Sequence, residues 1–327
     1  MLQVEAVLFA SRGGVVCKPE YKTPNEERMF MHWHSVVVYI ASSFCSVVVN
    51  KLILSVYRFP STFFLMFCHS TISLLFFWSK QFPHNNGAIA CLLNAANMLL
   101  GVLASNRMNI AMFSALRRVS VLMTLVAQWY FSNKTFSFPV VASVNLMVVG
   151  SLLAVVHDKT FEWEGYLLVT SNNVLTAASQ IASKSALGNG LRKECLIFYS
   201  EAAAAAVALV LSLPNLHSVL VFVHWSRLHF VVVFALSALL TLLLQYSTLW
   251  VLETNNPLTL AMSTSIQSGV MGLMVCLGLL DPTYQWSLFN FLGLQMSTVA
   301  SILYVWSDHS QIPDPEKPDI SDTTGPL

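Results

Sequence analysis

The chain has 327 residues, of which 55% are hydrophobic and only 10% are charged, and its mean hydropathy is +0.63. Because a soluble domain carries about 25% charged residues, this composition excludes an ordinary soluble protein and indicates an integral membrane protein. The formal net charge of +1 provides no basic field, which excludes nucleic acid as a partner selected by charge.

Residues 1–30 contain eight charged residues and lack a signal-peptide pattern, so we expect a cytosolic N-terminal tail. Ten runs without Lys, Arg, Asp or Glu follow, and a helix needs about 20 apolar residues to cross the hydrocarbon core. We therefore expect an all-α polytopic protein with transmembrane helices over residues 31–51, 61–80, 88–106, 112–132, 138–156, 164–185, 195–213, 229–252, 258–280 and 287–306.

The predicted helices form a single domain over residues 31–307, with proline and asparagine turns between the helices. Residues 308–327 contain four prolines and five acidic residues, a composition typical of a disordered tail. If the N-terminus is cytosolic, 10 of the 17 basic residues lie on the cytosolic side. The bias of Lys and Arg toward the cytosol therefore predicts that both termini are cytosolic.

Polar side chains recur at helical spacing inside several predicted spans. At about 100° per residue, one sector of the 112–132 helix holds Arg117, Ser120, Thr124 and Gln128. Arg118 points about 100° away, to the edge of this face. The 164–185 helix repeats the spacing with Asn173, Thr176, Gln180 and Lys184, and the first helix has a similar face with Tyr39, Ser43, Ser46 and Asn50. Lipid cannot satisfy such groups, so the faces line either a water-filled cavity or helix–helix contacts.

The two halves of the chain resemble each other faintly. Lys51 ends the first predicted helix and Lys184 ends the sixth, while Asn109 precedes the fourth and Asn256 precedes the ninth. Five helices per repeat is an odd number, so repeats over residues 31–156 and 164–306 would be inverted in the membrane. This is a transporter architecture with its binding site at the repeat interface.

Motifs of common enzymes are absent from the sequence, which contains no G-x-S-x-G, no H-E-x-x-H and no P-loop. His217, His224 and His229 share one predicted loop, but their spacing does not match a metal site. We therefore expect neither an enzyme nor a bound cofactor or metal.

Two segments carry a family resemblance. "MNIAMFSALRRVSVLMTLVAQWYFSNKTFSFPV" (108–140) and "FEWEGYLLVTSNNVLTAASQIASKSAL" (161–187) resemble the fourth and sixth helices of nucleotide-sugar transporters, in the UDP-sugar branch of the drug/metabolite transporter superfamily. The resemblance implies ten helices in two inverted five-helix repeats in a Golgi or endoplasmic reticulum membrane. It also implies that a central cavity exchanges a cytosolic nucleotide sugar for a lumenal nucleoside monophosphate.

This resemblance also implies roles for the polar residues. A guanidinium matches diphosphate oxygens in pairs, so the expected cations are Arg117, Lys184 and Lys51, with Arg118 beside them. Tyr199 would stack on the base or bond the ribose, and Asn172 and Asn173 offer donors and acceptors. The remaining polar residues of the two faces complete the expected substrate site, namely Ser120, Thr124, Gln128 and Gln180. The other expected partners are the lipid bilayer and, as an open alternative, a second copy of the chain.

Some positions depart from the family pattern. The branch usually carries Gly-x-x-Lys-Asn in its ninth helix, where this chain has Gln267-Ser268-Gly269-Val270-Met271 and no lysine. Glu201 is also unusual, and we expect it either to reach water or Lys193, or to pair with a cation in the cavity. The alternatives that stay open are a carrier of other phosphorylated metabolites and a non-transporting paralogue that acts as a membrane scaffold.

Overall fold

The computed structural model describes residues 24–78, 87–108, 110–132, 135–155, 163–276 and 288–309, and within them every regular element is helical. The expectation of an all-α protein is therefore confirmed. The α-helices are α2 (Pro24–Lys51), α3 (Thr62–Phe77), α4 (Ala88–Arg107), α5 (Ile110–Arg117), α6 (Ser120–Ser132), α7 (Phe138–Val155), α8 (Trp163–Gly188), α9 (Lys193–Ser212), α10 (Leu216–Leu220), α11 (Leu228–Thr254), α12 (Pro257–Cys276) and α13 (Leu288–His309). Short π and 3₁₀ segments occupy Leu52–Val56, Leu213–Asn215 and Val223–Ser226.

Local sequence signals set several helix starts. Pro24 and Pro257 are the first residues of α2 and α12, a position where proline has no hydrogen bond to lose. Ser61 precedes α3, and its hydroxyl accepts a hydrogen bond from the Phe64 amide at 3.2 Å. α2 begins at Pro24, earlier than the predicted residue 31, so the last part of the expected tail is helical.

The predicted continuous helix over 112–132 is wrong. α5 ends at Arg117 and α6 begins at Ser120, and the two turn residues between them break the helix. The amides of Arg118 and Val119 bond three residues back, to the carbonyls of Ala115 and Leu116, which is the tighter 3₁₀ pattern. The break lies within the segment that carries both arginines of the expected site.

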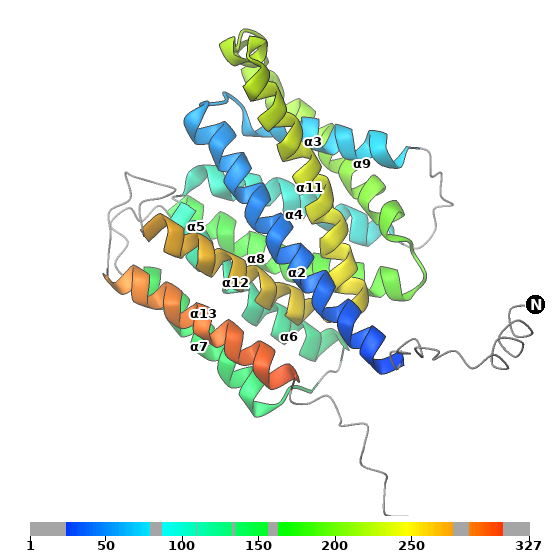
Figure 1. The fold of residues 1–327 in the computed structure, drawn as a ribbon, viewed down its shortest axis with the longest axis vertical. Helices are drawn as coiled ribbons and strands as arrows, with labels where there is room; N and C mark the ends of the chain where they lie inside the picture. Colours follow the sequence, from blue (N-terminus) through cyan, green and yellow to red (C-terminus); the bar gives the residue numbers. More distant parts are fainter. Residues whose placement is uncertain are drawn as a thin grey trace, which may run out of the picture.

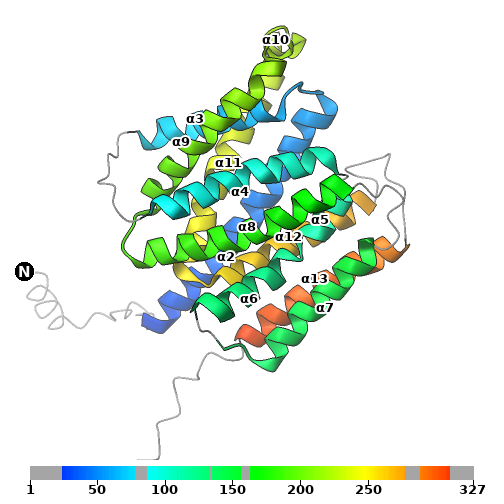
Figure 2. The same ribbon diagram turned by 180° about the vertical axis from the view of Figure 1, so that it is seen from behind.

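The helices pack in pairs that are distant in the sequence. α2 packs along α11, α4 along α8, α3 along α9 and α7 along α13. Figure 1 shows α2 beside α11, with α12 and α13 on the same side of the molecule. From behind, Figure 2 shows α4, α8 and α6 lying across the molecule, α3 with α9 toward one end, and α7 with α13 at the opposite edge.

Small residues allow a close contact between α7 and α13. A Cβ atom on Gly150 would lie 2.7 Å from both the Gly293 carbonyl oxygen and the Ser297 hydroxyl. The Ser297 hydroxyl donates a hydrogen bond to the Met147 carbonyl at 2.9 Å. Small residues and hydroxyl bonds at a helix interface are typical of membrane bundles, where burial of apolar surface does not drive association.

The surface of the molecule is apolar, as a bilayer requires. Within the described part of the chain, four stretches are long and apolar enough to cross a membrane: Trp33–Val56, Ala88–Arg107, Lys193–Leu220 and Leu228–Thr254. Large apolar side chains such as Phe76, Trp129 and Val232 are exposed on the helices. An exposed surface of this kind indicates contact with lipid rather than water. Residues 310–327 of the expected tail, Asn109 and Asn133 lie outside the described residues.

Candidate functional site

The helix break positions Arg117 where α2 and α12 come close to the end of α5. The Arg117 guanidinium lies over the Phe113 ring, 5.6 Å from its centroid. The Tyr39 hydroxyl of α2 is within electrostatic range of the same guanidinium. Tyr39 and Thr264 of α12 share a hydrogen bond of 2.7 Å. These contacts form a polar centre, which we define as Arg117, Tyr39 and Thr264.

Arg118 lies in the turn between α5 and α6. Its side chain is only 2% exposed and is among the most deeply buried large side chains in the described chain. Because the helix is interrupted at Arg118 and Val119, angles counted along one continuous helix do not fix its direction relative to the α6 face. Arg117 is the more accessible of the two arginines.

The polar faces of α6 and α8 meet each other, as two inward faces require. The Thr124 hydroxyl lies 3.4 Å from the Gln180 amide oxygen, and it also donates to the Ser120 carbonyl at 2.9 Å. Gln128 is buried, and its amide oxygen has no hydrogen-bond partner among the described residues. The predicted stripe therefore lies inside the bundle from Ser120 onward.

The two adjacent asparagines of α8 differ in their hydrogen bonds. The Asn173 side-chain amide donates to the Leu116 carbonyl at 2.9 Å, a carbonyl in the last turn of α5. Asn172 is fully buried next to Gly101 of α4, and neither of its side-chain polar atoms has a partner within the described residues. A buried polar group of this kind indicates a water or ligand contact.

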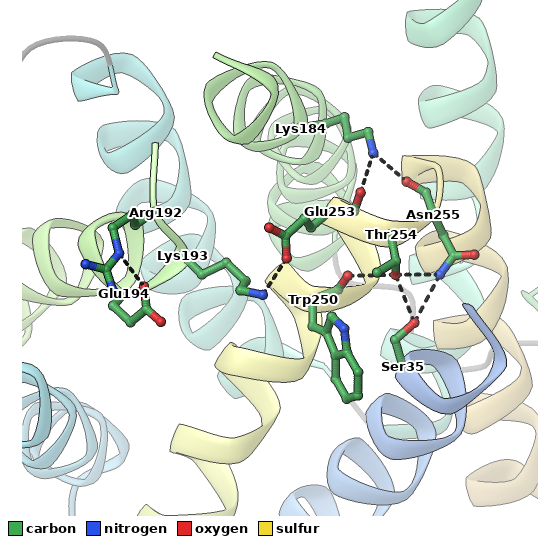
Figure 3. Close-up of polar contacts among 9 residues, drawn as sticks. All are labelled: Ser35, Lys184, Arg192, Lys193, Glu194, Trp250, Glu253, Thr254 and Asn255. Carbon is green, nitrogen blue, oxygen red and sulfur yellow. Dashed lines mark hydrogen bonds and ion pairs between the residues drawn. The ribbon is translucent and has the colours of Figure 1, made fainter. Parts of the chain in front are cut away.

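Lys184 does not face Arg117. Its ammonium donates to the carbonyls of Glu253 and Asn255, at 3.0 and 2.9 Å, and so caps the C-terminal end of α11 (Figure 3). Lys193 of α9 forms an ion pair with the Glu253 carboxylate at the same place. Lys184 is eleven residues beyond Asn173, which corresponds to about 16 Å along α8.

Lys51 lies away from the polar centre, twelve residues beyond Tyr39 on α2, or about 18 Å along the helix. Thr254 and Asn255, at the Lys184 end, bond Ser35 of α2, with both distances to the Ser35 hydroxyl near 3 Å. Lys51 is sixteen residues farther along α2, about 24 Å from Ser35. Tyr199 packs edge-on against Phe198 and against the apolar core cluster that also contains Tyr39. The three predicted cations therefore do not converge on one phosphate position.

A cavity of about 770 Å³ lies between α6, α8 and the start of α12. Gln128, Lys184 and Asn256 contribute polar groups, while most of its lining is apolar. Its volume falls in the range of about 300–1,000 Å³ that is usual for small-molecule sites. Arg117 and Asn172 are not among its lining residues, so the cavity adjoins the polar α6 and α8 faces at Gln128 rather than at the arginines.

Some residues of the site were missed at the level of sequence. Tyr39 lies in a predicted polar face but was not assigned to the substrate, and Thr264 was not selected at all. Asn97 accepts a hydrogen bond of 2.7 Å from Thr176, and the spacing of Asn94 and Asn97 in an apolar run could have indicated this face. Val270, where the family pattern has lysine, is 42% exposed.

Comparisons with known proteins give consistent results. No family model matches the chain. The chain is 31% identical over 308 residues to the UDP-sugar transporter UST74c of Drosophila melanogaster, with 87% of this chain and 80% of that protein covered. It is 30% identical over 309 residues to the UDP-sugar transporter sqv-7 of Caenorhabditis elegans, covering 87% and 90%. It is 27% identical over 288 residues to the nucleotide sugar transporter SLC35D2 of Homo sapiens, covering 83% and 84%.

The fold is shared with another protein of known structure. The crystal structure of that protein matches this chain with a TM-score of 0.60 at 11% sequence identity, and the match covers 88% of this chain and 99% of the other. At this identity the similarity supports the fold alone.

Proposed function

The chain belongs to the nucleotide-sugar transporter family, and we propose that it carries a UDP-sugar across a Golgi or endoplasmic reticulum membrane in exchange for a nucleoside monophosphate. It is a transporter and not an enzyme. The relatives named as UDP-sugar transporters support the choice of nucleotide. Under this proposal, both termini face the cytosol.

The observation that carries the proposal is the helix break beside Arg117. Transporters of this general architecture place interrupted helices at the centre of the membrane, next to the substrate. In this chain α6 begins three residues after Arg117, and the Val121 and Met123 amides of its first turn donate to the carbonyls of Arg118 and Val119. We infer that the diphosphate binds the Arg117 guanidinium rather than the amides of α6.

The surrounding residues fit the other parts of a nucleotide sugar. Tyr39, which is within electrostatic range of Arg117, and Thr264, which is hydrogen bonded to Tyr39, offer hydroxyl groups. The Asn172 amide and the Gln128 oxygen are buried polar atoms without a partner among the described residues. Thr124 and Gln180 continue the polar face on α6 and α8. Lys184 and Lys51 take more distant roles in this proposal, because each lies far from Arg117 along its helix.

The packing of the helices supports two inverted repeats. Suppose that α2, α3, α4 and α7 of the first repeat correspond, in that order, to α8, α9, α11 and α13 of the second. Exchanging the two repeats then turns the α4–α8 contact into the α11–α2 contact. The α3–α9 and α7–α13 contacts each join two corresponding helices. An exchange of the two halves therefore leaves the main contacts unchanged. This symmetry supports repeats over 31–156 and 164–306 and alternating access between them.

Transport can be tested with the purified chain in proteoliposomes. We expect labelled UDP-sugar uptake to increase when the vesicles are preloaded with UMP, because exchange needs a counter-substrate. A panel of UDP-, GDP- and CMP-sugars and triose phosphates identifies the substrate class. Uptake of triose phosphates alone would favour the other carrier, and no uptake of any compound by folded protein would favour the scaffold.

A further inference from the structure

A second polar cluster lies outside the Arg117 centre, where α3, α9 and α11 pack together. We call it the Glu201 cluster. The Gln245 side-chain amide of α11 donates to the Glu201 carboxyl at 2.5 Å, and the Ser73 hydroxyl of α3 donates to the Gln245 oxygen at 3.3 Å. The remaining members are His69, Ser70, Ser237 and Thr241, with His69 hydrogen bonded to Ser237 at 2.9 Å and to Thr241 at 3.3 Å.

Glu201 is buried far from any charge partner that the sequence suggested. Its side chain is only 1% exposed. Lys193, the expected partner near water, forms its ion pair with Glu253 instead. The expectation that Glu201 reaches water or Lys193 is therefore wrong. Glu201 faces inward, as the alternative expected, but among the described residues it contacts no cation.

The hydrogen bonds of Glu201 suit a neutral carboxyl group. Its Oε1 accepts one bond from a neutral amide. Its Oε2 is buried and has no hydrogen-bond partner within the described chain, although the Ser70 hydroxyl lies nearby. An ionised carboxylate with one neutral donor is very costly inside a bilayer, whereas the protonated acid removes the charge.

The other titratable groups on the packed helices do not neutralise Glu201. His69 of α3 bonds the two hydroxyl groups of α11, and Cys91 of α4 approaches the Leu196 carbonyl at 4.0 Å. Tyr246 of α11 faces the Lys193 ammonium, 5.3 Å from its ring centroid. In the described residues, none of these groups forms an ion pair with the Glu201 carboxyl.

We propose that Glu201 is a proton-binding site, protonated on Oε2 in this conformation, and that it exchanges this proton with water during the transport cycle. The proton leaves as a hydrated proton, and no other bond changes. Because α3 and α9 belong to different proposed repeats, movement of the repeats would open this interface to water. This last step rests on the proposed function, whereas the protonated state does not.

Infrared spectroscopy of the full chain in lipid tests the protonated state. At neutral pH we expect the C=O stretching band of a protonated carboxylic acid, and we expect Glu201→Gln to lose that band. The matched control is Glu253→Gln, which removes a more exposed, ion-paired carboxylate and should keep the band. If the band is absent from the wild type, or survives in Glu201→Gln, the proposal is wrong.

Gln245→Leu provides a second test of the same site. It removes the amide that donates to the carboxyl, so the charged form becomes less favourable and the band should persist to higher pH than in the wild type. A band that disappears at the same pH in both proteins would show that the signal does not come from the Glu201 cluster.

A pH gradient across proteoliposomes tests the exchange of the proton. One pH unit is a tenfold difference in proton concentration, so coupling of one proton changes UDP-sugar accumulation by up to about tenfold. We expect this dependence in the wild type and not in Glu201→Gln. Uptake that is insensitive to the gradient would overturn the coupling. Failure of the proposed function would instead appear as no uptake at any pH, and the infrared band would still decide whether Glu201 binds a proton.

Discussion

Arg117 and Arg118 are neighbours in sequence but meet different surroundings, because the helix breaks next to them. We predict that Arg117→Lys weakens UDP-sugar binding roughly 10- to 150-fold. Lysine keeps the charge but loses the planar fork, and a hydrogen bond to a charged group contributes about 1.5–3 kcal/mol. Competition binding on the purified variant measures this loss.

Arg118→Lys is the matched control. Its guanidinium is buried, so the substitution should lower the melting temperature more than Arg117→Lys and reduce binding less. Equal losses of affinity in both variants would mean that the two arginines act as one clamp, which would contradict the separate roles assigned here. No loss in Arg117→Lys would place the anion elsewhere.

Asn172 and Asn173 provide a second pair with opposite expectations. Asn172→Leu should leave the melting temperature unchanged or raise it, because its amide has no partner in the described protein. It should also weaken UDP-sugar binding by roughly 2- to 10-fold, which corresponds to the loss of one ordinary hydrogen bond. Asn173→Leu loses the bond to Leu116 and should cost about 1 kcal/mol of stability. A clear destabilisation by Asn172→Leu would show that its amide has a structural role.

At this scale the sequence predicts which residues face inward but not which of them meet. The polar face of α6 and that of α8 follow from helical spacing alone. The distance from Arg117 to Lys184 or Lys51 depends on how the helices pack, which spacing within one helix does not determine. Thr264 could not be selected because a single threonine in an apolar helix usually bonds its own backbone, as this one also does to Leu260.

The residue ranges of several helices follow closely from the distribution of charged residues along the sequence. The ends of α4, α7 and α11 lie within two residues of their predicted ranges, because a bilayer demands uninterrupted apolar runs of a fixed length. The break between α5 and α6 could not be predicted, since residues 110–132 contain neither Gly nor Pro. Tertiary contacts such as the Asn173 bond to Leu116 stabilise the break instead.

The contact between α7 and α13 depends on the absence of one side chain. We predict that Gly150→Ala destabilises the protein by about 1–3 kcal/mol, because the new methyl group would overlap the Gly293 carbonyl and force the helices apart. Gly188→Ala is the control, since a Cβ atom there meets nothing within 4 Å. Melting curves in detergent measure both. Equal melting temperatures for the two variants would mean that α7 and α13 are not packed this closely.

The whole molecule combines apolar outer surfaces with polar groups at the contacts between the two halves. Both the Arg117 centre and the Glu201 cluster join helices from different proposed repeats. Motion of one repeat against the other would therefore change the water access of both sites together, which is how a buried carboxyl could respond to transport.

Orientation in the membrane is the property of the whole molecule that a glycosylation test can decide. Asn133-Lys134-Thr135 is an N-x-T sequon between α6 and α7, and the proposed topology places it in the cytosol, so it should carry no glycan. His217→Thr completes a new sequon at Asn215, in the exposed segment between α9 and α11 that the topology places in the lumen. We predict that this variant gains a glycan removable by an endoglycosidase, while the wild type shows no change in mobility. A glycan on Asn133 would reverse the orientation, and it would then place Lys184, Lys193 and the end of α11 on the lumenal side.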